Sequence, residues 1–210
     1  MKAETLVITG IGGQGVILMS KIVARSAFEC GLTLNTLETL GAMQRGGPVY
    51  VQLRFGETEY GAAVAFGTAD AVISLEGYEG LRIASKFLRP GGTVIQNAKL
   101  LQVAGHFRTK RKPVTVEALA ELFQRIDATP VIVPAAEIAQ QVGNSRLENL
   151  AMLGAVVRLG YLPFDSEAVV NVIERSVPVG TEAINVEAFR AGYAWSAGPG
   201  SIAALDLAAS

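Results

Sequence analysis

The chain opens with a short β-branched run that ends in a cluster of glycines and is followed at once by a helical pattern. Thr5-Leu6-Val7-Ile8-Thr9 is typical of a buried strand, and Val16 to Glu29 places apolar residues near helical spacing. Between them, Gly10, Gly12 and Gly15 form a G-x-G-x-x-G pattern. A strand, a glycine turn and a helix in this order predict the beginning of a βαβ unit.

Beyond this unit, strand-like runs alternate with helical patterns. Val49 to Phe55 alternates apolar and polar residues, which predicts a half-buried strand, and we expect any antiparallel excursion to lie near residues 49–66. The other expected strands cover residues 32–40, 62–66, 71–75, 93–96 and 131–133, and the expected helices cover 76–88, 115–126, 135–142 and 145–160, with two more after Asp165 and Thr181. The pattern predicts an α/β fold of three layers, α/β/α, with a mostly parallel sheet, a Rossmann-like start and a helical C-terminal part.

The length and composition suit one domain. We place it at residues 1–197 of the 210, followed by a tail at 198–210 that is rich in Ala, Gly and Ser. Charged residues make up 18% of the chain, below the ~25% of typical soluble domains. Two explanations stay open: a partner covers part of the surface, or the central strands are apolar on both faces.

Several classes of function are disfavoured by the same composition. The formal net charge of −1 gives no general attraction to nucleic acid or to an anionic membrane. The single cysteine, Cys30, cannot form an internal disulfide, no CxxC spacing is present to hold a cluster, and we expect this thiol to be buried. No run of 18 apolar residues and no signal-peptide layout at Met1 to Glu4 are found, so we expect a cytoplasmic protein.

The glycine turn has two interpretations. Glycines at a helix N-terminus let backbone N–H groups approach an anion, which favours binding of a nucleotide or coenzyme phosphate. Dinucleotide binding also needs an acid at the end of the second strand, and the nearest candidate, Glu38, lies in a segment that soon becomes another glycine loop. The alternative is a closely packed turn without a ligand.

A second unusual loop is Gln44-Arg45-Gly46-Gly47-Pro48. Its glycines free the backbone to bend, while the Arg45 guanidinium offers a planar fork of donors to a carboxylate, a phosphate or a partner's backbone. An arginine on an ordinary turn is the alternative. Two further interpretations concern single residues: Glu76 is a helix-start acid or a polar contact in a cleft, and Gly154 inside a helix indicates tight helix packing.

Taken together, the motifs resemble those of one family. Gly10 to Val16, followed by Gly41-Ala42-Met43-Gln44-Arg45-Gly46-Gly47, is similar to the gamma-type subunit of 2-oxoacid:ferredoxin oxidoreductases. Leu88-Arg89-Pro90-Gly91-Gly92, Asn149 to Ala155 and the stretch from Asn185 to Gly192 extend the similarity over residues 5–195. Gln44 before Arg45 resembles the branch that acts on indolepyruvate and other aromatic 2-oxoacids, such as phenylglyoxylate.

The resemblance implies a function that this chain does not carry alone. Members of the family decarboxylate a 2-oxoacid on thiamine diphosphate, pass electrons through 4Fe–4S clusters to ferredoxin or onward to NAD, and release an acyl-CoA. By this resemblance, thiamine diphosphate and Mg²⁺ belong to partner subunits of alpha and beta type, the clusters to an iron–sulfur subunit, and coenzyme A binds at the interface. The basic residues 106–113 could bind coenzyme A or an acidic ferredoxin, or form a solvated loop.

The resemblance also implies which residues form the site. Gly12, Gly13, Gln14 and Gly15 are the candidate coenzyme-phosphate or interface turn, and Gln44, Arg45, Gly46 and Gly47 are the candidate cleft-facing loop. We expect the two bends to lie together at one edge of the sheet, facing a partner chain. A stand-alone NAD(P)-dependent dehydrogenase and a purely structural scaffold subunit remain as alternatives.

Overall fold

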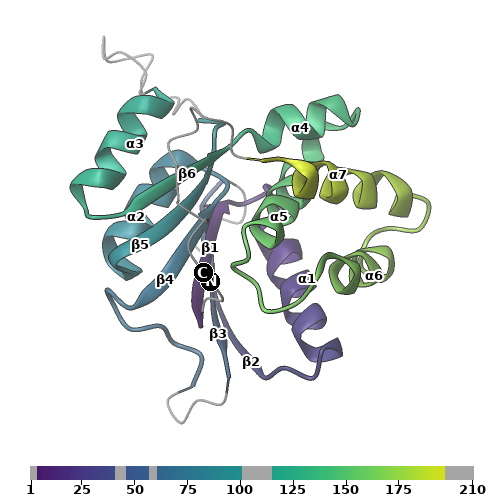
Figure 1. Cartoon of the computed structure of the whole chain (residues 1–210), viewed down its shortest axis with the longest axis horizontal. Helices are drawn as coiled ribbons and strands as arrows, with labels where there is room; N and C mark the ends of the chain where they lie inside the picture. Colours follow the sequence, from purple (N-terminus) through teal and green to yellow (C-terminus); the bar gives the residue numbers. More distant parts are fainter. Residues whose placement is uncertain (1–3, 41–45, 57–60, 101–114, 197–210) are drawn as a thin grey trace.

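A computed structural model describes residues 4–40, 46–56, 61–100 and 115–196, which form a six-stranded sheet with helices on both faces (Figure 1). The spatial order of the strands is β2-β3-β1-β4-β5-β6. Their bounds are β1 Thr5–Ile11, β2 Leu34–Leu40, β3 Pro48–Phe55, β4 Ala69–Ser74, β5 Leu88–Asn97 and β6 Thr129–Val133. The predicted three-layer α/β class is confirmed.

The sheet is parallel on one side of β1 and antiparallel on the other. β1, β4, β5 and β6 pair in parallel, whereas β3 pairs antiparallel with both β1 and β2. The antiparallel excursion near residues 49–66 is therefore confirmed for β3. The expected strand over residues 62–66 is wrong, because this segment crosses the face of β3 instead, with the Val64 N–H donating to Oε1 of Gln52 over 2.7 Å.

Helices cover both faces of the sheet (Figure 1), and the buried hydrophobic residues form two clusters, one on each face. Leu6, Ile8 and Val51 point to the face that α1 covers, while Val7 and Val72 point to the face that α2 covers. This alternation follows from the period of two in a strand. Helices α1 (Val16–Glu29), α4 (Ala135–Gln141), α5 (Glu148–Arg158), α6 (Ser166–Ser176) and α7 (Glu182–Ala194) lie on the first face, and α2 (Gly77–Phe87) and α3 (Val116–Arg125) lie on the second.

Helix starts follow the local sequence closely. Glu76, Thr115 and Asp165 each cap a helix by accepting a hydrogen bond from the N–H three residues later. The helix expected from residue 145 begins later: Asn144 accepts the Arg146 N–H and caps a 3-10 turn over Ser145–Leu147, and α5 begins only at Glu148. Asn144 serves as the cap because its backbone has the extended conformation that an N-cap residue requires.

Helix α5 is buried along most of its length, and two glycines let α7 cross it closely. A Cβ at Gly154 would overlap the backbone oxygen of Phe189, and one at Gly192 would overlap the backbone oxygen of Ala151. The tight packing predicted for Gly154 is confirmed. Cys30 differs from its prediction, because the helix ends there and its thiol is exposed rather than buried.

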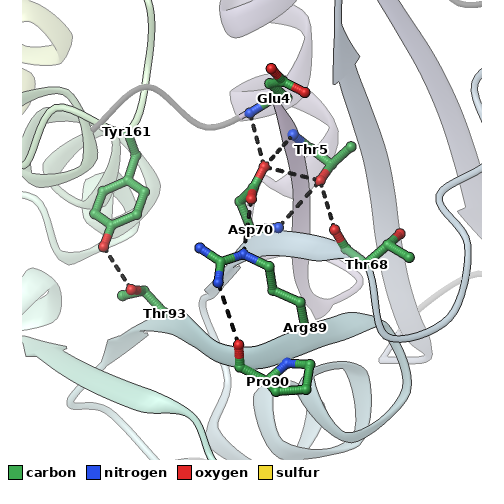
Figure 2. A network of polar contacts seen from close by, with 8 residues as sticks. All are labelled: Glu4, Thr5, Thr68, Asp70, Arg89, Pro90, Thr93 and Tyr161. Atoms are coloured by element: carbon green, nitrogen blue, oxygen red, sulfur yellow. Dashed lines mark hydrogen bonds and ion pairs between the residues drawn. The ribbon is translucent and has the colours of Figure 1, made fainter.

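A polar network joins the amino ends of β1, β4 and β5 (Figure 2). The Asp70 carboxylate accepts the N–H groups of Glu4 and Thr5 at 2.9 and 3.0 Å, and the Arg89 Nε at 3.0 Å. Burial alone raises the pKa of Asp70, but these donors outweigh it and hold the pKa below its usual value. Nearby, the Tyr161 hydroxyl donates to Oγ1 of Thr93 over 2.7 Å, and burial raises the pKa of this phenol. The network thus links the strands at their amino ends, whereas the glycine turn lies at the carboxyl end of β1.

Candidate functional site

The two glycine segments meet at the carboxyl end of β1. The Gly12 N–H donates to the carbonyl oxygen of Gly47 over 2.8 Å. The β1–β3 ladder ends at the pair Ile11↔Pro48, so this bond falls on the next step of the same register. Since Pro48 has no N–H, it cannot also continue the β2–β3 ladder, which ends one step earlier at Leu40↔Val49. The expected proximity of the two bends is confirmed.

The second loop approaches Gly12 to ordinary van der Waals distance. A Cβ on Gly12 would lie 3.4 Å from the Gly46 nitrogen and 3.6 Å from the Gly47 oxygen. Gly46 itself has a φ of 73°, in the left-handed region that favours glycine. Gly46 is therefore favoured by its backbone conformation, whereas the space beside Gly12 would admit a Cβ.

The side-chain amide of Gln14 makes two hydrogen bonds to the backbone of this chain. Its Oε1 accepts the Ile11 N–H over 2.7 Å, and its Nε2 donates to the carbonyl oxygen of Leu75 over 3.1 Å. The side chain thus closes the turn and ties it to the residue after β4. The sequence predicted Gln14 as part of a coenzyme-phosphate or interface turn, and in the structure its side chain holds that turn in shape.

Gly15 is held from the other side by α5. It has a φ of 83°, and a Cβ there would overlap the Asn149 side chain, whose Nδ2 lies 3.5 Å from the Gly15 oxygen. Gly15 is the N-cap of α1 and provides no side-chain cap, so the first amides of this helix are not satisfied by a cap side chain. A pocket of about 290 Å³ opens over this turn, lined by Ile11, Gly12, Gly13, Gly15, Val16, Ile17 and Val49.

The position of this pocket in the sheet is the one where α/β folds place ligands. Chain connections from β1 and β4 run to opposite faces, since α1 packs on one core and α2 on the other. The carboxyl ends of β1 and β4 therefore border a topological switch point. Glu76 follows β4 here, but its carboxylate caps α2 by accepting the Glu79 N–H over 2.9 Å. The helix-start interpretation of Glu76 is thus confirmed.

A buried carboxylate, Glu148, lies near the carboxyl end of β5, and the sequence analysis did not single it out. Glu148 is 5% exposed. Its Oε2 accepts hydrogen bonds from Nζ of Lys99 over 3.1 Å and from Nδ2 of Asn97 over 3.4 Å. Lys99 follows β5, whereas Glu148 starts α5, so no local pattern links them. The only signal in the sequence was the run from Asn149 to Ala155, which begins one residue later.

The remaining site predictions stand as follows. Gln44 and Arg45 lie outside the described residues, as do residues 106–113 and the tail at 198–210. Glu38 lies on β2, which β3 separates from β1. An acid there does not adjoin the glycine turn as a ribose-binding acid would, so the geometry disfavours a dinucleotide. Within the part of the chain that the structure describes, no cluster of three His, Cys, Asp or Glu residues could hold a metal ion.

The fold and the turn define a class: a Rossmann-like α/β domain whose candidate site is made almost entirely of backbone. Such a site suits an anion or a neighbouring chain, and the side chains around it serve to hold it. The sequence model described as pyruvate ferredoxin/flavodoxin oxidoreductase matches residues 5–195. The chain therefore belongs to the pyruvate ferredoxin/flavodoxin oxidoreductase family, as its motifs predicted, and is an oxidoreductase subunit of that family.

Individual relatives agree with this assignment. The chain is 33% identical to indolepyruvate oxidoreductase subunit IorB of Thermococcus kodakarensis, over 91% of this chain and 95% of that one. It is 35% identical to the subunit of the same name from Archaeoglobus fulgidus, over 90% and 92%.

Solved structures share the fold. Pyruvate oxidoreductase subunit PORC of Thermotoga maritima aligns with a TM-score of 0.68 at 24% identity, covering 92% of this chain and 96% of that one. The gamma subunit of a keto/oxoacid ferredoxin oxidoreductase from Geobacter sulfurreducens aligns with a TM-score of 0.65 at 22% identity, covering 90% and 95%. Within the described residues, no helix combines the length and the apolar character needed to cross a bilayer.

Proposed function

We propose that this chain is the gamma-type subunit of a thiamine-diphosphate-dependent oxidoreductase for aromatic 2-oxoacids, with indolepyruvate, arylpyruvates or phenylglyoxylate as substrates. The reaction is oxidative decarboxylation to an acyl-CoA, with electrons passed to ferredoxin or NAD. Thiamine diphosphate, Mg²⁺ and the 4Fe–4S clusters are held by partner subunits. The similarity to indolepyruvate oxidoreductase subunits over nine tenths of the chain supports the substrate class.

The role of this chain in the reaction is to complete the assembly and to form the coenzyme A side of the cleft. The observation that carries this role is the hydrogen bond between Gly12 and Gly47, because it joins both candidate loops beside one open pocket. The phosphates of coenzyme A would lie against the first turn of α1, where the helix dipole is positive. Arg45 would add a guanidinium to the same anion.

Substitution at Ile17, which lines the pocket in the first turn of α1, tests the coenzyme site. In the assembled enzyme, Ile17→Glu places a carboxylate beside the proposed phosphate position, and Ile17→Gln is the neutral control of the same size. We expect the KM for coenzyme A to rise by about tenfold or more for the glutamate variant, with kcat at saturation little changed. Equal KM values for the two variants in a fully assembled enzyme would contradict a coenzyme site here.

Two further measurements separate the alternatives. Comparing indolepyruvate and phenylglyoxylate with pyruvate, 2-oxoisovalerate and 2-oxoglutarate tests the substrate class, and a preference for the aliphatic acids would overturn it. Hydrogen exchange at residues 10–15 and 46–47 within the complex tests for a scaffold role. We expect coenzyme A to slow exchange there, whereas unchanged exchange would leave this chain as scaffold only.

A further inference from the structure

The outer strand β2 leaves half of its backbone groups unpaired by the sheet. β2 is an edge strand, and the Gly56 N–H donates to the Thr33 oxygen over 2.9 Å at the start of its ladder with β3. Antiparallel pairs alternate between hydrogen-bonded and non-hydrogen-bonded steps. In the register of β2 with β3, Asn35 and Leu37 therefore turn their N–H and C=O toward β3, whereas Thr36 and Glu38 turn theirs outward.

Within the described residues, β2 itself carries little of the usual protection of a free sheet edge. Isolated proteins blunt an edge with proline, lysine, a bulge or a covering element, because open edges pair with other chains. β2 contains neither proline nor lysine and carries one charge, Glu38, whereas the opposite edge strand β6 contains Pro130. Leu37 is 40% exposed on the face of the sheet away from α1.

An apolar hollow adjoins the beginning of the same strand. It measures about 420 Å³ and is lined by Ala24, Phe28, Gly31, Leu32, Thr33 and Leu34. Phe28, one of the lining residues, is 81% exposed. On the other side of Phe28, a neighbouring hollow is lined by Arg25, Arg175 and Glu29, and Glu29 pairs with Arg175 over 2.7 Å, which leaves one positive charge in excess. A segment that enters the hollow is thus favoured if it carries a carboxylate.

We propose that β2 is the docking edge for an extended segment of a partner subunit. The segment adds one strand to the sheet along β2, places a bulky apolar side chain in the hollow beside Phe28, and sets a carboxylate against Arg25 and Arg175. Strand addition supplies affinity through the backbone and specificity through the hollow. The far end of β2 pairs with Val49, which lines the pocket over the glycine turn, so the docked chain leads toward that pocket.

Amide hydrogen exchange at single-residue resolution gives a signature that only strand addition produces. In the isolated chain, Thr36 and Glu38 should exchange quickly, while Asn35 and Leu37 are already protected by β3. In the assembled complex, Thr36 and Glu38 should slow by about tenfold or more. Unchanged exchange at these two amides in the complex overturns the proposal. Protection that grows with the concentration of the isolated chain also overturns it, because the occupant is then a second copy.

A matched pair of variants tests the same edge by assembly. Thr36→Pro removes an outward N–H that the fold does not use, whereas Thr36→Val keeps it. We expect the proline variant to keep its own melting temperature within a few degrees yet to weaken the complex about tenfold or more in Kd, and the valine variant to assemble normally. Equal assembly of the two overturns the docking edge. A wild-type complex that forms but lacks 2-oxoacid oxidation would instead contradict the proposed function.

Discussion

The carbonyl oxygen of Leu75 accepts a hydrogen bond of 3.1 Å from Nε2 of Gln14, and this contact ties the glycine turn to the end of β4. With Oε1 of the same side chain on the Ile11 N–H, one amide group fixes the geometry of the whole turn. The shape of the pocket over α1 therefore depends on a residue that does not line it.

Replacing Gln14 by Glu should destabilise the chain although the side-chain size is unchanged. A carboxylate cannot donate to the Leu75 oxygen and places two oxygens against each other. We expect a loss of about 1–3 kcal/mol in the free energy of unfolding, measured with urea. Gln124→Glu on the exposed side of α3 is the control and should stay within about 0.5 kcal/mol of wild type. Equal effects of both variants would show that Gln14 does not hold the turn.

Gly154→Ala tests whether the added methyl group raises or lowers the free energy of unfolding. In an uncrowded helix, alanine in place of glycine stabilises by about 1 kcal/mol. Here the added Cβ would overlap the backbone oxygen of Phe189, which can yield only if α7 moves as a unit. We expect destabilisation by about 2–4 kcal/mol in thermal or urea unfolding. A stabilised variant would refute the close crossing of α5 and α7.

Asp70→Asn should remove part of the pH dependence of stability. The pKa of Asp70 is lower in the folded chain than in the unfolded one, so its contribution is present above the unfolded value of about 3.9 and is lost as the pH falls through the folded value. We expect the variant to lose about 1–3 kcal/mol at pH 7 and the difference from wild type to shrink below pH 4. Urea unfolding at several pH values measures this, with Asp127→Asn on an exposed turn as control. A difference that stays constant down to pH 2 would contradict the assignment.

Lys99→Met and Glu148→Gln should have unequal effects. Removing the lysine leaves the buried Glu148 carboxylate with the long hydrogen bond from Asn97, at 3.4 Å, as its remaining side-chain partner among the described residues. Removing the carboxylate leaves a lysine whose side chain is 41% exposed and can turn to water. We therefore expect the lysine variant to be the less stable of the two by about 1–2 kcal/mol at neutral pH. The reverse order in urea unfolding would contradict the burial of this pair.

Much of the fold could be read from local sequence. The β-branched run before Gly10, the helix from Val16 to Glu29 and the caps at Thr115 and Asp165 all depend on neighbouring residues, and the structure agrees with each. The strand expected at residues 62–66 failed because the apolar pattern there reports burial against β3, through Val64 and Gln52, rather than pairing. The helix expected from residue 145 starts at Glu148 instead, because Asn144 is an equally good cap by local preference and begins a 3-10 turn first.

The sequence alone determined the family, the two glycine loops and the alternation of strands and helices, since spacing and residue type express these directly. Only the tertiary structure decided that β3 enters between β1 and β2, that Gly12 bonds Gly47, and that Lys99 reaches Glu148. Each of these joins residues from different elements, and the free energy that selects such contacts comes from the packing of the whole sheet rather than from any local stretch.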